Sequence, residues 1–204
     1  MNKGLQLVTG DIIGFLNSDD YLAAPDIIEK IVNKFKNSNS EAVYGNLIFV
    51  KKESPTIMYR LWKSKKYKHT LPLYGWTLPH PTFYVRKQVY EKHGLFNTDF
   101  KYAADYEIII RFLFKKKIIV THINEVFVYM RSGGVTNGNL SSRYKVHLED
   151  RKVWESLGLS PRWYTLFLKP TRKIFQFIIP VISIKRKFNS LPEYQKDNMN
   201  KHII

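Results

Sequence analysis

Two groups of acidic side chains in this sequence combine residue types and surroundings that could do chemistry. The first is Asn17-Ser18-Asp19-Asp20, directly after the apolar run 12–16, which is typical of a strand buried on both faces. Ligands bind at the carboxyl ends of strands in open α/β sheets, and oxygen ligands there suit Mg²⁺ or Mn²⁺. The alternative is an Asx-type turn, because Asn and Asp are ordinary turn residues after strands.

The second group centres on Asp105, in the first turn of an amphipathic helix predicted over residues 104–116. A carboxylate placed there against an apolar face could act as a general base. The alternative is an ordinary N-terminal acid that the helix dipole favours. Glu107 and Arg111 stand four positions apart and predict an ion pair along the same helix.

His80 and Arg131 are candidates of a different kind, because each lies next to residues that shape a loop. His80 stands between Pro79 and Pro81, which would present the imidazole rigidly, although a lone histidine is also an ordinary structural group. Arg131 comes at the end of a predicted strand, just before the flexible segment 132–134. This segment could fold over phosphates, or it could form a plain hairpin.

The hydrophobic pattern predicts alternating strands and helices to position these residues. We expect residues 51–80 to be irregular, because they are basic and aromatic and carry prolines at 55, 72 and 79. The other expected elements are the end of a helix at 1–9, strands at 12–16, 42–50, 82–85, 118–122 and 126–130, and helices at 25–36, 87–93, 104–116, 139–157 and 162–177. This alternation predicts an α/β protein with a mostly parallel sheet.

Composition excludes several classes of protein. The 204 residues are 44% hydrophobic and 15% aromatic, which is enough for a real core and excludes disorder as the main description. The absence of cysteine excludes disulfide scaffolds, zinc fingers and thiol nucleophiles. We find no signal peptide and no run of 18 apolar residues. We therefore expect a cytoplasmic protein.

The net charge of +16 indicates a polyanionic partner: a nucleic acid, an acidic membrane surface or a phosphorylated substrate. Residues 162–187 mix aromatic and basic side chains, which suits a helix in an anionic membrane interface. The alternative is a C-terminal helix that packs on the sheet and keeps a solvated basic face. The membrane reading would place the protein peripherally on the inner face of the plasma membrane.

In their order along the chain, these motifs resemble those of family 2 glycosyltransferases with the GT-A fold, of the type that makes bacterial surface polysaccharides. The resemblance covers residues 1–137 and implies a truncated GT-A sheet flanked by helices. We expect residues 138–188 to be a basic, aromatic helical extension and 189–204 a polar tail. The segments that carry the resemblance are Asn2-Lys3-Gly4 with Thr9-Gly10-Asp11-Ile12-Ile13, Phe15-Leu16-Asn17-Ser18-Asp19-Asp20, His80-Pro81-Thr82-Phe83, Ala104-Asp105-Tyr106-Glu107 and Tyr129-Met130-Arg131.

The resemblance implies a role for each candidate residue. Asp19 matches the ligand of Mg²⁺ or Mn²⁺ and Asp20 is a supporting acid, while Asn17 stands where the family usually has an aspartate. Asp105 matches the base that takes a proton from the acceptor hydroxyl in an inverting transfer. The remaining implied roles are donor binding for Asn17 and Arg131, and acceptor binding for His80 and Trp76.

The implied partners are a nucleotide-sugar donor and a lipid-linked or saccharide acceptor, with no nucleic acid. The resemblance also implies nucleobase-binding units that have no counterpart in this sequence, so we expect the chain by itself to bind a nucleotide sugar weakly or not at all. Two alternatives remain: a non-catalytic scaffold in a polysaccharide assembly complex, and a basic nucleic-acid-binding module. The second explains the charge but gives the acids at 19 and 105 no task.

Overall fold

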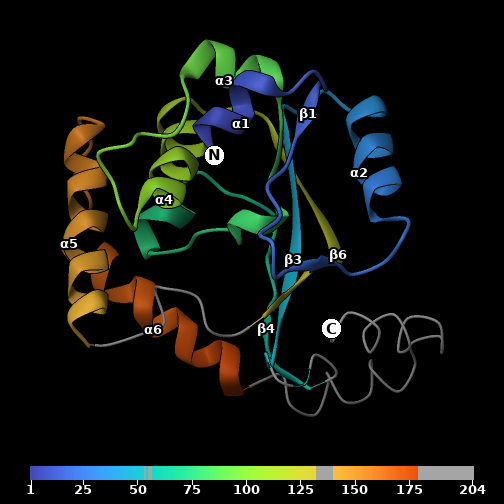
Figure 1. Cartoon of the computed structure of the whole chain (residues 1–204). Helices are drawn as coiled ribbons and strands as arrows, with labels where there is room; N and C mark the ends of the chain where they lie inside the picture. Colours follow the sequence, from blue (N-terminus) through green and yellow to red (C-terminus); the bar gives the residue numbers. More distant parts are fainter. Residues whose placement is uncertain (53, 55–56, 132–139, 179–204) are drawn as a thin grey trace.

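A computed structural model describes residues 1–52, 54, 57–131 and 140–178. Figure 1 shows a central sheet with helices on both sides: α2 (Ile27–Lys36) covers one face, and α1 (Asn2–Leu7), α3 (Lys87–His93) and α4 (Ala104–Ile109) cover the other. Farther out, α5 (Leu140–Ser156) and α6 (Thr165–Ile178) lie beyond α4. The α/β class is therefore confirmed.

The sheet is mixed rather than mostly parallel, and this part of the sequence-based expectation is wrong. Its strands follow the order β1 (Ile12–Ile13), β5 (Tyr84–Arg86), β3 (Ala42–Val50), β6 (Val120–Arg131) and β2 (Tyr21–Leu22), and β4 (Met58–Trp62) also pairs with β3. Strand β3 runs parallel to β6, whereas it is antiparallel to both β4 and β5. The short connection from β3 to β4 returns the chain as a hairpin, so it cannot produce a parallel pair.

Strand β3 is the centre of the sheet and is buried at all nine positions. Its side chains alternate between the two faces: Val43 and Phe49 pack with α2, while Ala42 and Tyr44 face the core beneath α1, α3 and α4. The β3–β6 register shifts at Gly45, between Tyr44 and Leu47. The ring of Phe127 fills the space that a side chain at position 45 would need.

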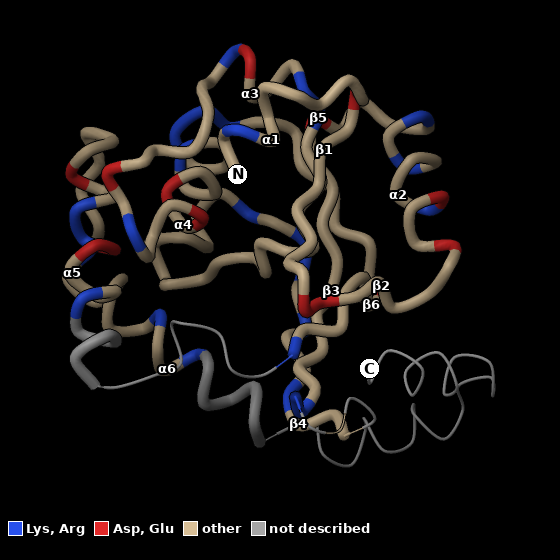
Figure 2. Tube along the Cα trace, viewed as in Figure 1, with Lys and Arg blue, Asp and Glu red and all other residues tan. Residues whose placement is uncertain are grey.

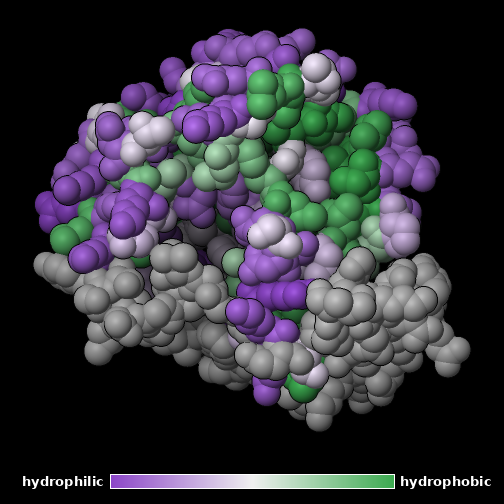
Figure 3. Space-filling view, viewed as in Figure 1, coloured by the Kyte–Doolittle hydropathy of each residue, from purple (hydrophilic) through white to green (hydrophobic). Residues whose placement is uncertain are grey.

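The strand expected at 12–16 is much shorter than its apolar run suggests. Strand β1 comprises Ile12–Ile13 and pairs with β5 at the edge of the sheet, and Leu16 is 44% exposed. Gly14 passes directly over the ring of Tyr84, where a Cβ atom would lie 2.3 Å from a ring carbon. The chain thus leaves the sheet at Gly14, and Phe15 packs elsewhere. Figure 3 shows apolar side chains on the surface between β1 and α2.

Other predicted elements are confirmed within a few residues, with two exceptions. The expected strands at 118–122 and 126–130 are one continuous strand, β6. Strand β4 lies inside the segment expected to be irregular. Its polar–apolar pattern did not predict a strand because the buried position 60 is an arginine, which is only 9% exposed and lies over the rings of Phe49 and Trp62. None of the helices in the described ranges has the length and hydropathy to cross a membrane.

The C-terminal helices share a core with α4 instead of standing apart from the sheet domain. Trp154 of α5 is fully buried and donates from Nε1 to the hydroxyl of Tyr106 at 3.0 Å. Lys169 of α6 forms an ion pair with Asp150 at 2.6 Å and lies over the Tyr106 ring. Beyond Ile109, α4 continues as a π-helical segment, Ile110–Lys115. Its Ile110 joins this core, whereas Phe112 and Leu113 pack into the core beneath α1 and α3.

Candidate functional site

The loop 17–20 connects β1 to β2 (Tyr21–Leu22) and forms a turn closed by a hydrogen bond from the Asp20 amide to the Asn17 carbonyl. The Asp20 carboxylate is 8% exposed and accepts two hydrogen bonds. Asn17 Nδ2 donates to Oδ2 at 2.8 Å, and the Arg131 amide donates to Oδ1 at 3.2 Å. Asp20 therefore ties this loop to the end of β6.

Burial raises the pKa of Asp20 above its ordinary value, although the hydrogen bonds from Asn17 and Arg131 partly oppose this shift. The neighbouring carboxylate of Asp19 raises it further. Asp19 itself is exposed. The turn thus separates the two acids: one is directed into the protein and the other towards solvent.

The opposite orientations of Asp19 and Asp20 leave only Asp19 available as a ligand for the expected metal ion. Within residues 1–52, 54, 57–131 and 140–178, no three His, Cys, Asp or Glu side chains converge into a set that could hold a metal ion. Both oxygens of Asp20 are already engaged by protein donors, so Asp20 is poorly placed as a ligand. Asp19 offers one exposed carboxylate. A single carboxylate fits Mg²⁺, which commonly binds one or two carboxylates together with substrate phosphates.

His80 begins the short helix η2 (His80–Thr82) and lies between two aromatic rings. Its ring stacks on Phe15 with centroids 5.9 Å apart, and Phe96 meets it edge-on at 5.6 Å. Thr82 is fully buried and its Oγ1 lies 3.2 Å from the Gly45 carbonyl, which anchors η2 on β3. Burial lowers the pKa of His80, and the nearby Asp105 carboxylate partly opposes that effect.

Asp105 is therefore close enough to His80 to act on it electrostatically. Asp105 is exposed, in the first turn of α4, and its Oδ1 accepts a hydrogen bond from the Tyr106 amide at 2.8 Å. The lowered pKa leaves the His80 imidazole neutral at pH 7, with one donor nitrogen and one acceptor nitrogen. The pair thus combines a solvent-accessible carboxylate with a neutral imidazole.

Glu149 of α5 fixes the start of α4, and our sequence-based reasoning missed it. Its Oε2 accepts hydrogen bonds from the amides of Tyr102 and Ala103 at 2.7 and 2.9 Å, and Oε1 accepts one from Lys101 at 3.3 Å. These amides immediately precede the helix that carries Asp105. The sequence gives no signal for this contact, because it joins positions 46 to 48 residues apart.

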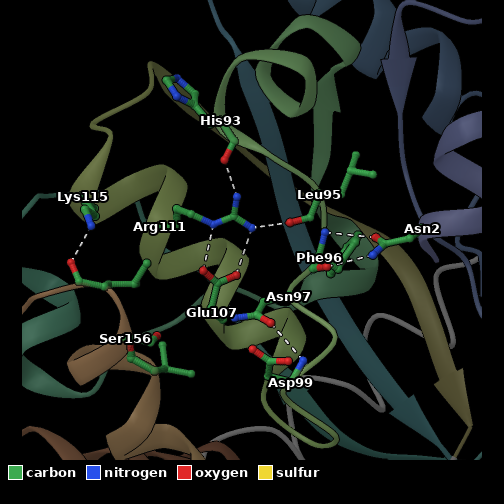
Figure 4. A network of polar contacts seen from close by, with 12 residues as sticks. Asn2, His93, Leu95, Phe96, Asn97, Asp99, Glu107, Arg111, Lys115 and Ser156 are labelled. Carbon is green, nitrogen blue, oxygen red and sulfur yellow. Dashed lines mark hydrogen bonds and ion pairs between the residues drawn. The ribbon is translucent and has the colours of Figure 1, made fainter.

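Arg111 holds the loop between α3 and α4, as Figure 4 shows. The expected ion pair is confirmed: Arg111 Nε and Glu107 Oε1 are 2.8 Å apart, and the two side chains are only 12% and 4% exposed. The guanidinium also donates to the carbonyls of His93 and Leu95. Leu95 directly precedes Phe96, so this buried pair supports the ring that contacts His80.

Trp76 does not lie where the resemblance suggested. It is 7% exposed and packs against the rings of Tyr44 and Tyr67, with centroids 6.0 and 5.9 Å away. A sugar cannot stack on an indole enclosed in this way, so we do not retain Trp76 as an acceptor-binding residue. The rings found beside His80 are those of Phe15 and Phe96, and the strand expected at 12–16 had placed Phe15 in the sheet.

Arg131 ends β6 and contributes its backbone amide to Asp20, while its side chain is partly buried. The glycines expected to fold over phosphates, Gly133 and Gly134, lie outside the described residues. Phe15 and Asp19 are four residues apart, so their Cα atoms are separated by at most about 14 Å. One short segment therefore connects the Phe15–His80–Asp105 group to the exposed acid at 19.

This fold is part of a GT-A glycosyltransferase fold. The chain superposes on the structure of S. aureus TarS 1–349 in complex with UDP-GlcNAc with a TM-score of 0.56 and 16% identity, covering 76% of this chain and 44% of that one. A second structure of S. aureus TarS 1–349 gives a TM-score of 0.52 at 14% identity, covering 84% and 49%. The chain thus spans less than half the length of these structures.

A sequence comparison adds to this likeness of fold. Residues 1–94, just under half of the chain, match the model for glycosyl transferase family 2. The segment contains Asn17, Asp19, Asp20 and His80, while Asp105 and Arg131 lie beyond it. No protein of curated function matches the chain significantly in sequence.

Proposed function

We propose that this chain takes part in an inverting transfer of a sugar from a nucleotide-diphosphate donor to a hydroxyl acceptor, in the synthesis of a bacterial surface polysaccharide. The observation that carries the proposal is the Asp105–His80–Phe15 group, in which Phe15 lies four residues before Asp19. The match of residues 1–94 to family 2 and the likeness to a structure holding UDP-GlcNAc support it.

Asp105 acts as the general base in this proposal. Its carboxylate takes the proton of the acceptor hydroxyl while that oxygen attacks the anomeric carbon, and the nucleoside diphosphate leaves from the opposite face. The neutral imidazole of His80 supplies a hydrogen-bond donor and an acceptor to the acceptor sugar. The Phe15 and Phe96 rings fix the imidazole between them.

Asp19 acts on the donor side of the site, where it binds the cation. Its exposed carboxylate is the protein's ligand for Mg²⁺ or Mn²⁺, and such a cation supplies charge neutralisation for the diphosphate. Asp20 acts as a positioning residue, because it fixes the turn to β6 through Asn17 and the Arg131 amide. Arg131 lies at this junction, and its cationic side chain suits a diphosphate.

The test is thermal unfolding of the full chain with UDP or UDP-GlcNAc, with and without Mn²⁺, followed by hydrolysis of UDP-GlcNAc. We expect Mn²⁺-dependent protection by UDP that Asp19→Ala abolishes and Asp105→Asn retains. Asp105→Asn should lower turnover about 10²- to 10⁴-fold, which is the range for loss of a general base.

Several outcomes would contradict the proposal. Protection that is independent of Mn²⁺, or unchanged in Asp19→Ala, would remove Asp19 from the donor site. Unchanged turnover in Asp105→Asn would show that Asp105 is not the general base. Glu29→Ala is the matched control, since Glu29 is an acid on the far side of the sheet in α2 and should change neither measurement.

A further inference from the structure

An exposed group of aromatic and basic side chains surrounds the junction between the short helix η1 (Leu71–Tyr74) and the start of α6. Trp163 is 83% exposed, Phe167 63% and Tyr74 39%. We call Tyr74, Arg162, Trp163, Tyr164 and Phe167 the aromatic patch. Neither the transfer reaction nor the core packing uses these exposed rings.

The aromatic patch rests on a rigid base. Thr165 is fully buried and its hydroxyl donates to the Leu73 carbonyl, while Leu166 packs into the core shared by α4 and α5. Gly75 has a φ of 71°, and a Cβ atom there would lie within 2.8 Å of the α6 backbone. The first turn of α6 is therefore pressed directly onto η1, which holds Trp163 and Phe167 outward.

A cluster of cations adjoins the aromatic patch. Arg162 lies over the rings of both Tyr74 and Tyr164, and Arg172 donates from Nε to the Tyr74 carbonyl at 2.7 Å. Lys65 and Lys68 are exposed. Burial lowers the pKa of Lys65, and the nearby charges of Arg172 and Lys68 lower it further. Figure 2 shows that basic residues gather along β4 and at the start of α6.

We propose that the aromatic patch and the cations Arg162, Lys65, Lys68 and Arg172 bind the surface of an anionic phospholipid bilayer. Tryptophan, tyrosine and phenylalanine enter the boundary between headgroups and acyl chains, where their rings are half solvated. Lysine and arginine contact the lipid phosphates, each strengthening binding about fivefold. This surface goes beyond sugar transfer, because it requires neither nucleotide nor metal.

The packing of the rings favours a bilayer over a single-stranded nucleic acid. Nucleobases bind by stacking on free ring faces. Tyr74 and Tyr164 stack on each other at 5.8 Å, and Arg162 lies over both, so their faces are largely covered within the protein. A bilayer interface needs exposed amphipathic area and positive charge, and the patch offers both.

The test is flotation of the full chain with vesicles of phosphatidylcholine alone, or with about one third phosphatidylglycerol. We expect binding to the anionic vesicles that decreases with salt. Trp163→Ala/Phe167→Ala should weaken it about tenfold, and Lys65→Gln/Lys68→Gln about 25-fold. The matched controls, Leu7→Ala and Lys34→Gln/Lys36→Gln, remove an exposed apolar side chain and two charges elsewhere and should bind as the wild type does.

Intrinsic fluorescence gives a second measurement. Trp76 and Trp154 are buried, and Trp62 is partly buried with Arg60 over its ring, whereas Trp163 is highly exposed. A blue shift on adding anionic vesicles should therefore be largely lost in Trp163→Phe. Equal flotation of the patch variants and the wild type would overturn the proposal. So would an absence of binding to anionic vesicles, or tight binding of a short single-stranded RNA by a chain that ignores vesicles.

Discussion

Asn2 and Phe96 hydrogen-bond each other in both directions, although 94 positions separate them in the sequence. Asn2 Nδ2 donates to the Phe96 carbonyl at 2.8 Å, and the Phe96 amide donates to Asn2 Oδ1 at 3.0 Å. The side chain of Asn2 thus satisfies the backbone N–H and C=O of Phe96, as a neighbouring β-strand would. Since the Phe96 ring meets His80, α1 helps to position the proposed acceptor side of the site.

We predict that Asn2→Ala lowers the free energy of unfolding by about 1–3 kcal/mol, because it leaves the polar groups of Phe96 without these partners. Urea denaturation measures the change. Asn33→Ala, at an exposed position of α2, should change stability by less than about 0.5 kcal/mol. Equal effects of the two substitutions would show that the Asn2–Phe96 contact is unimportant.

The buried pair Glu107–Arg111 should matter far more than an exposed pair with the same spacing. Glu107→Ala leaves the Arg111 guanidinium buried without its counter-charge, which costs about 3–5 kcal/mol. The exposed pair Arg151–Glu155 also has i, i+4 spacing, and Glu155→Ala should cost about 0–1 kcal/mol. Urea denaturation of both variants measures the two losses of unfolding free energy. Similar losses would contradict the stabilising role that we assign to the buried Glu107–Arg111 pair.

The local part of this structure could be predicted from the sequence. The apolar stripe of α2, the nine-residue run of β3 and the stop at Gly94 each depend on spacing within one element. The pairing of Glu107 with Arg111 is likewise local. The motifs in residues 1–20 also indicated the family that residues 1–94 match.

The rest depends on contacts between distant segments that no local pattern encodes. In the sequence, Phe15 looks like one more residue of a buried strand, but in the structure its ring stacks on His80. Trp76 follows a basic, irregular stretch, yet Tyr44 and Tyr67 enclose it. Asp19 and Asp20 are chemically identical neighbours, and the turn alone decides that one is buried.

Protonation of His80 should destabilise the folded chain. The folded-state pKa of His80 lies below its unfolded value of about 6.5, so the unfolded state takes up the proton first as pH falls. The contribution of His80 to stability is therefore complete above about pH 6.5 and is lost as pH falls towards the folded-state pKa, at up to about 1.4 kcal/mol per pH unit.

The measurement is the free energy of unfolding of wild type and His80→Gln between about pH 7.5 and 5. The difference between them should shift in favour of His80→Gln as pH falls, and an NMR titration should place the His80 ring below 6.5. His122→Gln serves as a control that leaves the His80 ring in place. A His80 ring that titrates at or above 6.5 would mean that Asp105, rather than burial, dominates.

Gly75 should tolerate no side chain. Gly75→Ala combines a φ of 71° with a Cβ atom 2.5 Å from the Lys169 amide nitrogen, and the obstacle is backbone that cannot rotate away. We expect a loss of about 1–3 kcal/mol in unfolding free energy from the forced shift of α6. Gly4→Ala is the matched control, because its Cβ atom would have nothing within 4 Å. A Gly75→Ala chain as stable as the wild type would show that α6 is not pressed onto η1.

Loss of charge should affect stability at Asp20 but hardly at Asp19. Burial raises the folded-state pKa of Asp20, so its contribution to stability is complete below the unfolded value near 3.8 and is lost as pH rises through the raised pKa. The stability of wild type relative to Asp20→Asn should accordingly decline as pH rises through that window. Asp19→Asn, at an exposed position, should change stability by less than about 0.5 kcal/mol at pH 7 and abolish the Mn²⁺-dependent effect of UDP. Guanidinium denaturation across the acid range measures the first effect, and a flat difference there would show that the Asp20 carboxylate is not held in the interior.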